Sequence, residues 1–231
     1  MFNSILFIGR KNCIYSEKLK KFFNIKSKKF TYIESKYKKQ KIKLNDKEKY
    51  DYIFCFRSFL ILKKSQLNQA IYGAINFHPG TPDFRGIGCI NYAIYKNVKK
   101  YGSTCHLMDD KIDNGKIIDV SYFKIDRQSN LSQLLRKTHK TMFIQAINII
   151  NYLFKDHKNL IKLIKQNNNI KWSKKIYKIR DLEMLYRIDL NKSKTGILNQ
   201  IRSTYLNEYR PYILHKKIKY YLDKKLLDEK N

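Results

Sequence analysis

Residues 73–80 read Gly-Ala-Ile-Asn-Phe-His-Pro-Gly, and this stretch decides how the rest of the chain is interpreted. Residues 73–77 form a short apolar run that ends at a turn signal, which is typical of a buried strand. Asn76 and His78 then stand where that strand ends, and open α/β sheets place their ligands at that edge. The stretch therefore predicts a polar site at the edge of an α/β sheet.

Strand and helix patterns alternate on both sides of this stretch. Such alternation predicts an α/β fold with a Rossmann-like, doubly wound and mostly parallel sheet, which we expect to be followed by a small α+β C-terminal extension. Ser16 is the expected N-cap of the first helix, and Asn130 with Gln133 in capping-box position begins the clearest helix. The expected strands are residues 4–8, 29–34, 52–56, 73–77, 101–108 and 117–124, and the expected helices are residues 16–24, 65–72, 89–96 and the stretch that follows residue 130.

The domain limits follow from changes in the pattern after the long helix. Residues 1–155 are predicted to form the main domain, and residues 156–170 a polar linker or the end of that helix. Residues 171–231 are predicted to form a small subdomain of helices and one hairpin. Its expected helices are residues 179–188 and 191–202, and its expected hairpin strands are residues 210–214 and 216–222.

The composition is that of a globular protein with an extreme positive charge. The hydrophobic fraction is 43%, and the formal net charge of +30 would ordinarily indicate a polyanionic partner such as nucleic acid. Only nine of the 49 basic residues are arginine, although arginine is the residue that specific phosphate and base recognition favours. We therefore interpret most of the charge as solvated lysine that attracts anionic substrates, and we rank a nucleic acid partner lower.

Cysteine spacing and apolar runs exclude further classes of protein. The four cysteines have neither paired spacing nor histidines at metal-ligand spacing, so neither a disulfide framework nor a metal site is expected. The longest apolar stretch, residues 143–154, is interrupted by polar amides, and the apolar run near the N-terminus lacks a cationic segment before it. We expect a cytoplasmic protein without a membrane span, and a homodimer is one candidate assembly.

Asn76, His78 and Asp113 are the residue types needed to move an acyl group onto an amine. An amide can donate to a developing oxyanion, an imidazole can carry a proton, and a carboxylate can set the charge of that imidazole. Asp113 lies in an Asp-Asn-Gly turn between two expected strands, which would return it to the sheet edge that carries His78. Each residue alone has an ordinary interpretation, since Asp-Asn-Gly is a common turn and a single histidine after a strand is often a core or turn residue.

Four blocks of sequence follow one another in a fixed order. They are residues 76–79 (Asn-Phe-His-Pro), 84–86 (Phe-Arg-Gly), 101–106 (Tyr-Gly-Ser-Thr-Cys-His) and 112–118 (Ile-Asp-Asn-Gly-Lys-Ile-Ile). This text resembles the blocks Asn-x-His-Pro, Arg-Gly, Gly-x-Thr and Asp-x-Gly-x-Ile of the 10-formyltetrahydrofolate-dependent formyltransferases. That family includes glycinamide ribonucleotide transformylase, methionyl-tRNA formyltransferase and the sugar-nucleotide N-formyltransferases. The resemblance implies that residues 1–155 form a formyltransferase catalytic domain.

The resemblance also implies roles for individual residues. Carried over block by block, the family's catalytic residues fall on Asn76, His78 and Asp113, with 10-formyltetrahydrofolate as co-substrate and no metal. The family's folate pocket falls on the loop before the first block and on the loop that carries the aspartate. The residues expected there are Phe59, Leu60, Ile61, Leu62, Asp109, Asp110 and Lys111, and those expected at the amine substrate are Gly80, Arg85 and Arg10.

Departures from the family's patterns narrow the expected substrate. The loop after the first strand, residues 7–13, has one glycine and the cations Arg10 and Lys11, so it lacks the glycine-rich phosphate cradle of glycinamide ribonucleotide transformylase. The His-Pro-Gly form and the short C-terminal region are closer to enzymes that formylate nucleotide-linked amino sugars. Alternatives are a methionyl-tRNA formyltransferase-like enzyme with a reduced C-terminal region and a non-enzymatic folate- or RNA-binding relative. Candidate nucleotide contacts in the C-terminal region are Trp172, Tyr205, Arg202 and Tyr212.

Overall fold

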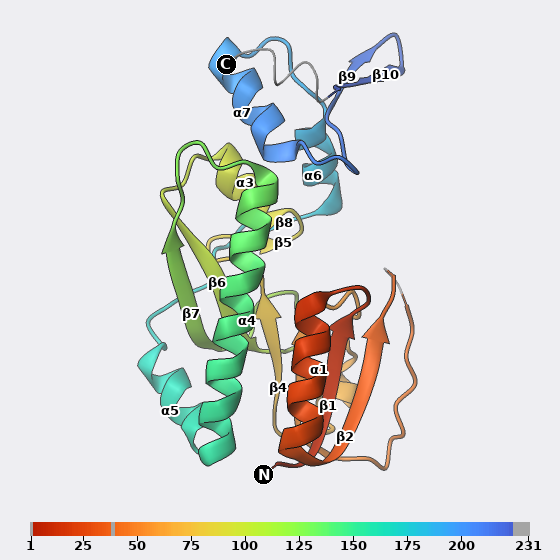
Figure 1. Ribbon diagram of the computed structural model, residues 1–231, viewed down its shortest axis with the longest axis vertical. Helices are drawn as coiled ribbons and strands as arrows, with labels where there is room; N and C mark the ends of the chain where they lie inside the picture. The colour runs from red at the N-terminus through yellow and green to blue at the C-terminus, as the bar shows by residue number, and fades with distance from the viewer. Residues whose placement is uncertain (1, 38–39, 224–231) are drawn as a thin grey trace. The chain divides into compact units, whose positions relative to one another are not determined.

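The computed structural model describes residues 2–37 and 40–223 (Figure 1). Its strands are β1 (Phe2–Arg10), β2 (Ser27–Ser35), β3 (Tyr50–Phe56), β4 (Ala70–His78), β5 (Arg85–Gly86), β6 (Lys100–Leu107), β7 (Ile117–Lys124), β8 (Ile176–Tyr177), β9 (Tyr212–His215) and β10 (Ile218–Tyr221). Its helices are α1 (Ile14–Lys26), α2 (Lys64–Leu67), α3 (Cys89–Tyr95), α4 (Leu131–Lys155), α5 (Asn159–Gln166), α6 (Ile179–Tyr186) and α7 (Lys194–Thr204).

A six-stranded sheet with the order β2-β1-β3-β4-β6-β7 organises the described part of the chain. Strand β1 pairs in parallel with β2 and β3, β3 pairs in parallel with β4, and β4 pairs antiparallel with β6. The predicted α/β fold with a mostly parallel sheet is confirmed. Because β1, β3 and β4 run in the same direction, their carboxyl ends lie along one edge of the sheet.

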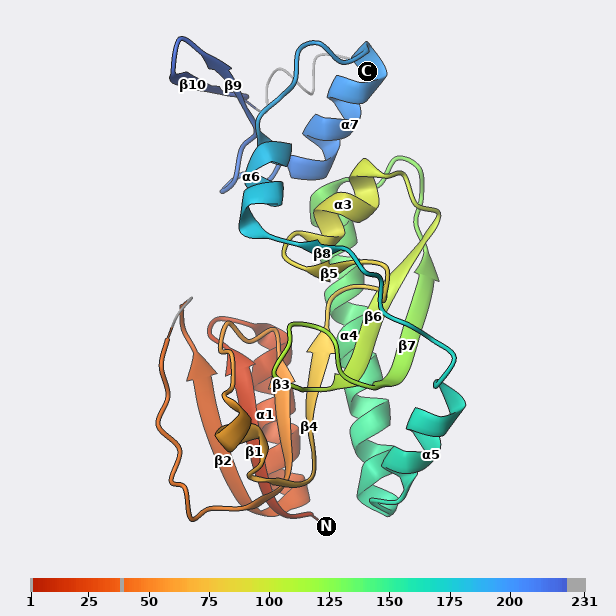
Figure 2. The same ribbon diagram turned by 180° about the vertical axis from the view of Figure 1, so that it is seen from behind.

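Both faces of the central strands are buried, which explains their nearly continuous apolar sequences. On one face, Ile5 and Phe7 belong to a core cluster with residues of α1 and α4, and both helices lie in front of the strands in Figure 1. On the other face, Leu6 and Ile8 pack with residues from the coil before β3 and from the loop after it. Figure 2 shows this face, with the short orange helix α2 in front of the sheet.

The start of α1 differs from the prediction. The helix begins at Ile14, its N-cap is Cys13, and Ser16 lies inside the first turn, so the assignment of Ser16 as N-cap is wrong. The Ser16 hydroxyl accepts a hydrogen bond from the backbone N–H of Arg10 at 3.1 Å. Ser16 is fully buried at that position. It therefore fixes the chain between β1 and α1 and does not cap the helix.

Two further elements differ from the sequence patterns. The helix expected over residues 65–72 is restricted to α2, and residues from Ala70 onward belong to β4. The segment 156–170, predicted as a linker or helix end, contains the separate helix α5, whose Leu160 is buried in the same core cluster as Phe7. In both segments tertiary packing decides which conformation the chain adopts, because short apolar runs are compatible with helix and with strand.

The start of α4 agrees with the prediction. The Asn130 side chain accepts a hydrogen bond from the Gln133 backbone at 2.9 Å, and the Gln133 side chain accepts one from the Asn130 backbone at 2.9 Å. This reciprocal capping satisfies two backbone donors that the helix leaves open. Within the described ranges, no helix combines the length and apolar content needed to cross a bilayer.

The described residues divide into two compact units. Unit 1 consists of the described residues in the ranges 1–82, 102–122 and 138–172. Unit 2 consists of the described residues in the ranges 83–101, 123–137 and 173–231. Unit 2 has its own core, and it contains the hairpin of β9 and β10 at the predicted place. The contiguous domain limits 1–155, 156–170 and 171–231 stay a prediction, and residues 224–231 lie outside the described residues.

Candidate active site

The centre of the site is a cross-strand pair of polar residues in unit 1. Asn76 on β4 lies directly opposite His106 on β6 in the antiparallel ladder. Side chains of directly opposed residues share one face of the sheet, and so do residues two apart on a strand. Asn76, His78 and His106 therefore project on the same side, near the carboxyl end of β4.

Asp113 reaches this side from the loop between β6 and β7. Its backbone has φ 44°, in the left-handed region that aspartate tolerates better than most residues. Close packing of the loop requires glycine at position 115, because a Cβ atom there would lie 1.9 Å from the Leu107 carbonyl oxygen. The sequence Asp-Asn-Gly thus allows the tight approach that brings Asp113 over β6.

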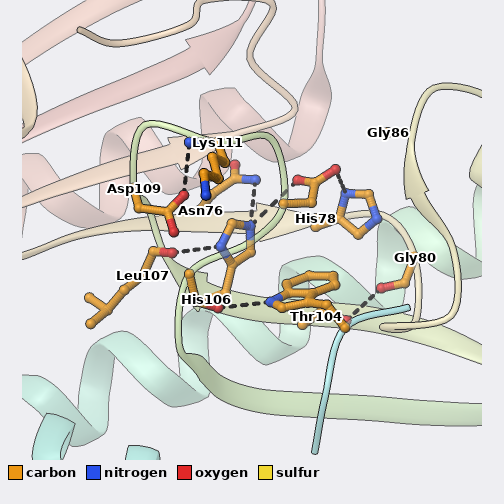
Figure 3. A network of polar contacts seen from close by, with 12 residues as sticks. Asn76, His78, Gly80, Gly86, Thr104, His106, Leu107, Asp109 and Lys111 are labelled. Carbon is orange, nitrogen blue, oxygen red and sulfur yellow. Dashed lines mark hydrogen bonds and ion pairs between the residues drawn. The ribbon is translucent and has the colours of Figure 1, made fainter. Parts of the chain in front are cut away.

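The Asp109 side chain organises the same loop. One of its oxygens accepts a hydrogen bond from the Lys111 backbone N–H at 2.9 Å (Figure 3), and the other accepts one from the Asn114 amide at 2.8 Å. Such turns, closed by a side-chain oxygen two residues back, stabilise non-regular backbone. Three residues of this loop were predicted for the folate pocket. The Asp109 side chain is hydrogen-bonded within the loop, whereas Asp110 and Lys111 are exposed.

The contacts among the site residues are direct. His78 Nδ1 lies 3.3 Å from Asp113 Oδ2, and His106 Nε2 lies 3.6 Å from Asp113 Oδ1. Asn76 Nδ2 lies 3.2 Å from His106 Nε2, and His106 Nδ1 lies 2.7 Å from the Leu107 carbonyl oxygen (Figure 3). His78 and His106 are only 3% and 2% exposed. The structure brings together the three predicted residues and adds His106, which the sequence analysis did not single out.

Trp172 covers the two imidazoles. Its ring meets those of His106 and His78 nearly edge-on, with centroids 5.1 Å and 5.9 Å away. Its indole N–H donates to the Gly115 carbonyl at 2.8 Å, which ties it to the Asp113 loop. Trp172 was expected as a nucleotide contact, whereas its observed contacts are to the histidines and the loop.

The segment Phe59–Leu62 lies between β3 and α2. Leu60 and Leu62 are buried in the core, whereas Ile61 is 79% exposed, so of these three residues predicted for the folate pocket only Ile61 presents its side chain at the surface. Within residues 2–37 and 40–223, the backbone groups of Ile61 and Leu62 make no hydrogen bonds. The exposed Ile61 side chain, beside backbone groups that have no hydrogen-bond partner in the described residues, fits the edge of a flat heterocycle such as a pterin.

A positively charged cluster lies along the same sheet edge. Gly9 pairs with Phe56 and Phe56 with Phe77, so Arg10, Arg57 and His78 each come directly after one of these paired residues at the same end of the sheet. The Arg10 guanidinium lies over the Phe59 ring at 4.1 Å. Arg57, which the sequence analysis missed, follows β3 with φ 55°.

Two neighbouring groups respond to these arginines. Burial, and then the charges of Arg57 and Arg10, lower the pKa of His139 on α4 to about 3. Burial raises the pKa of the Cys13 thiol, but a hydrogen bond with Ser16 and the nearby Arg57 guanidinium outweigh it and lower the pKa overall. Burial, the largest cause for His139, opposes charge of either sign, whereas the two arginines disfavour protonation of His139 and Arg57 favours the Cys13 thiolate.

The other predicted substrate residues are engaged within their own units. The buried Gly80 accepts a hydrogen bond through its carbonyl from Thr104 Oγ1 at 2.6 Å, in unit 1 (Figure 3). Arg85 is buried in unit 2, where it donates to the Ser173 carbonyl at 2.9 Å. Arg202 donates to the Arg127 carbonyl, and the Tyr212 ring lies 5.7 Å from that of Tyr221, both in unit 2. Substrate roles for these residues stay predictions.

Comparison with known proteins identifies the family. A family model described as "Formyl transferase" matches residues 7–149, which include all four residues of the site. The chain belongs to the formyl transferase family. A relative of this formyl transferase, the methionyl-tRNA formyltransferase of Ehrlichia canis, is 30% identical over 148 residues, which are 62% of this chain and 44% of that protein. The chain thus spans less than half the length of this relative.

Solved structures of other proteins have the same fold as this formyl transferase over nearly the whole length of its chain. A sugar N-formyltransferase from Shewanella sp. FDAARGOS_354 has a TM-score of 0.68 at 20% identity and covers 95% of this chain and 96% of its own. An N-formyltransferase from Helicobacter canadensis, in complex with folinic acid and dTDP-3-aminofucose, has a TM-score of 0.65 at 21% identity, with 94% and 86% covered. The resemblance inferred from the four sequence blocks and the formyltransferase fold are confirmed.

Proposed function

We propose that this protein is an N-formyltransferase that moves the formyl group of 10-formyltetrahydrofolate to the primary amine of a nucleotide-linked amino sugar. The observation that carries the proposal is the convergence of Asn76, His78 and Asp113, in which an imidazole lies 3.3 Å from a carboxylate beside a half-buried amide. This set matches what formyl transfer to an amine requires, because an oxyanion develops and one proton must leave the attacking nitrogen.

Each residue has a defined task in this reaction. The acceptor nitrogen adds to the formyl carbon, and Asn76 donates a hydrogen bond to the oxygen on which negative charge develops. His78 turns Nδ1 toward Asp113, and we assign to its other ring nitrogen, Nε2, the role of a second donor to the oxyanion when the ring is protonated. Asp113 accepts the proton of the attacking nitrogen through His78 or a water molecule and passes it on to N10 by the same route, and the bond between N10 and the formyl carbon breaks.

The co-substrate assignment is supported by the segment Phe59–Leu62. Its exposed Ile61 and the unbonded backbone groups of Ile61 and Leu62 suit a pterin, which needs stacking area and an edge of donors and acceptors. The Helicobacter canadensis relative was solved with folinic acid, which belongs to the same chemical class. If the pterin binds near this segment, the formyl group of the donor would lie toward the carboxyl ends of β3 and β4.

The acceptor assignment is supported by Arg10 and Arg57. Two guanidinium groups at the ends of adjacent strands suit a pyrophosphate, since each presents a fork of donors that matches phosphate oxygens. The register of β1, β3 and β4 puts them on the same edge as His78, on strands about 5 Å apart. The dTDP-3-aminofucose bound to the Helicobacter canadensis relative carries both a pyrophosphate and an amine.

Formylation of charged initiator tRNA is the second candidate function. The observation in its favour is the 30% identity to the methionyl-tRNA formyltransferase of Ehrlichia canis, together with the net charge of +30. This function requires tRNA binding that weakens steeply as the salt concentration rises. The amino sugar is preferred because the charge resides mostly in lysines spread along the chain.

An acceptor panel separates the two candidates. The purified protein is incubated with 10-formyltetrahydrofolate and, separately, with dTDP- and UDP-linked 3-amino and 4-amino sugars or with methionyl-tRNA. We expect tetrahydrofolate to form at a saturable rate with one of the nucleotide sugars and at background rate with the tRNA. Turnover with methionyl-tRNA alone would establish the second function, and no turnover with any amine would contradict both.

A further inference from the structure

His106 is a second buried imidazole in the site, and the formyl-transfer mechanism described above does not use it. Its ring makes three polar approaches, all within unit 1: Nδ1 to the Leu107 carbonyl at 2.7 Å, Nε2 to Asn76 Nδ2 at 3.2 Å, and Nε2 to Asp113 Oδ1 at 3.6 Å. The first two are hydrogen-bond distances, whereas the third is too long for one.

These distances determine which ring nitrogen carries the proton. A carbonyl oxygen only accepts hydrogen bonds, so Nδ1 at 2.7 Å from the Leu107 oxygen must be the N–H donor. Nε2 faces the amide nitrogen of Asn76, which is itself a donor. If Nε2 also carried a hydrogen, two donors would meet at 3.2 Å. These contacts fit the tautomer with the hydrogen on Nδ1 and a lone pair on Nε2.

The lone pair on Nε2 has a consequence for Asn76. The amide group of an asparagine has a donor end and an acceptor end, and rotation by half a turn exchanges them. An acceptor at His106 Nε2 holds the nitrogen on the side of β6 and leaves one N–H of that nitrogen for another acceptor. The opposite tautomer, or an imidazolium, would instead attract the amide oxygen and turn the group around.

We propose that His106 is a positioning residue that holds the Asn76 amide in the orientation that presents an N–H to the formyl oxygen. This inference rests on the proposed function for the identity of the acceptor oxygen. The backbone supports it, because Asn76 and His106 are directly opposed in the ladder. Trp172 supports it as well, since its ring packs edge-on against His106 with centroids 5.1 Å apart and restrains the imidazole.

Two substitutions separate this role from simple packing. In His106→Gln, the side-chain amide reaches the place of Nε2 and can supply an oxygen acceptor to Asn76. In His106→Asn, the shorter amide reaches only the place of Nδ1, so the contact with Leu107 is kept and the acceptor is lost. We expect His106→Asn to lower kcat by about a hundredfold, as for loss of one oxyanion donor, with little change in KM. We expect His106→Gln to retain kcat close to the wild-type value.

The tautomer itself is measured by nitrogen NMR of the wild-type protein with ¹⁵N-labelled histidine, and the His106 signals are those missing in His106→Gln. We expect a protonated Nδ1 and an unprotonated Nε2 at the pH of the activity assay. A protonated Nε2 would overturn the inference, and so would equal kcat values for the two variants. If the wild-type protein transfers no formyl group while Nδ1 is protonated, the proposed function fails and the tautomer assignment stands.

Discussion

Replacement of Asp113 by asparagine tests the acid–base part of the mechanism. Asparagine has nearly the same shape, and it can still accept a hydrogen bond from His78 Nδ1, which lies 3.3 Å from the carboxylate. The substitution removes the negative charge and the basic oxygen, and little else. Loss of a positioned acid–base group lowers kcat by about a hundredfold to ten-thousandfold, which is about 3–5 kcal/mol of transition-state stabilisation.

The stability cost of this substitution is expected to be small. The Asp113 side chain is 10% exposed, and the asparagine keeps one hydrogen-bond acceptor in its place, so the free energy of unfolding should change by no more than about 1 kcal/mol. The measurement is the steady-state rate of tetrahydrofolate formation, together with urea unfolding of each variant. Asp46→Asn, at an exposed position in the coil before β3, is the matched control and should behave as wild type. A folded Asp113→Asn protein with kcat within about threefold of wild type would refute a proton-transfer role for Asp113.

Three further predictions concern the surroundings of the site. Arg57→Ala should raise the KM for the nucleotide sugar about tenfold or more with little effect on kcat, because a charge-assisted hydrogen bond to phosphate is lost; an unchanged KM in steady-state kinetics would exclude Arg57 from the acceptor site. Trp172→Phe keeps a ring but loses the N–H donor to Gly115, so urea unfolding should show a loss of about 1 kcal/mol, and equal stability would mean that this bond contributes nothing. The pKa of His139 is about 3 in the folded protein, against an ordinary 6.5, so the unfolded chain binds more protons between these values and stability falls as the pH drops below about 6.5. Lowering the pH from 7 to 5 should therefore reduce the free energy of unfolding of the wild-type protein by about 2 kcal/mol more than that of His139→Gln. Urea midpoints at both pH values measure this difference, and an identical pH dependence of the two proteins would contradict the buried neutral state of His139.

The sequence predicted those parts of the site that lie in continuous motifs. Asn76 and His78 are fixed by the end of one strand, and Asp113 by a turn between two strands, so local pattern was sufficient to place them on one sheet edge. His106 was missed because its importance comes from the register between β4 and β6, which puts it opposite Asn76. Strand register across a gap of many residues is set by packing and not by any local sequence signal.

The same limit explains the differences in the fold. The alternation of strands and helices and the capping of α4 by Asn130 were readable, because they depend on periodicity and on residues three apart. The sequence did not show that the helix expected over residues 65–72 would be replaced by a short helix and the start of β4. That segment gains its strand conformation by pairing with β3. Arg57 gains its place in the charged cluster from the same pairing.

Transfer of an isotopic label tests the central claim most directly. The protein is incubated with 10-formyltetrahydrofolate carrying ¹³C in the formyl group and with the nucleotide-linked amino sugar that supports turnover, and the products are analysed by mass spectrometry and ¹³C NMR. The proposed convergence of Asn76, His78 and Asp113 on one formyl group predicts that the label appears as a formamide on the sugar nitrogen, and that Asp113→Asn slows its appearance to the same extent as tetrahydrofolate formation. Label that remains on the folate, or that is released only as formate with every amine tested, would contradict the account.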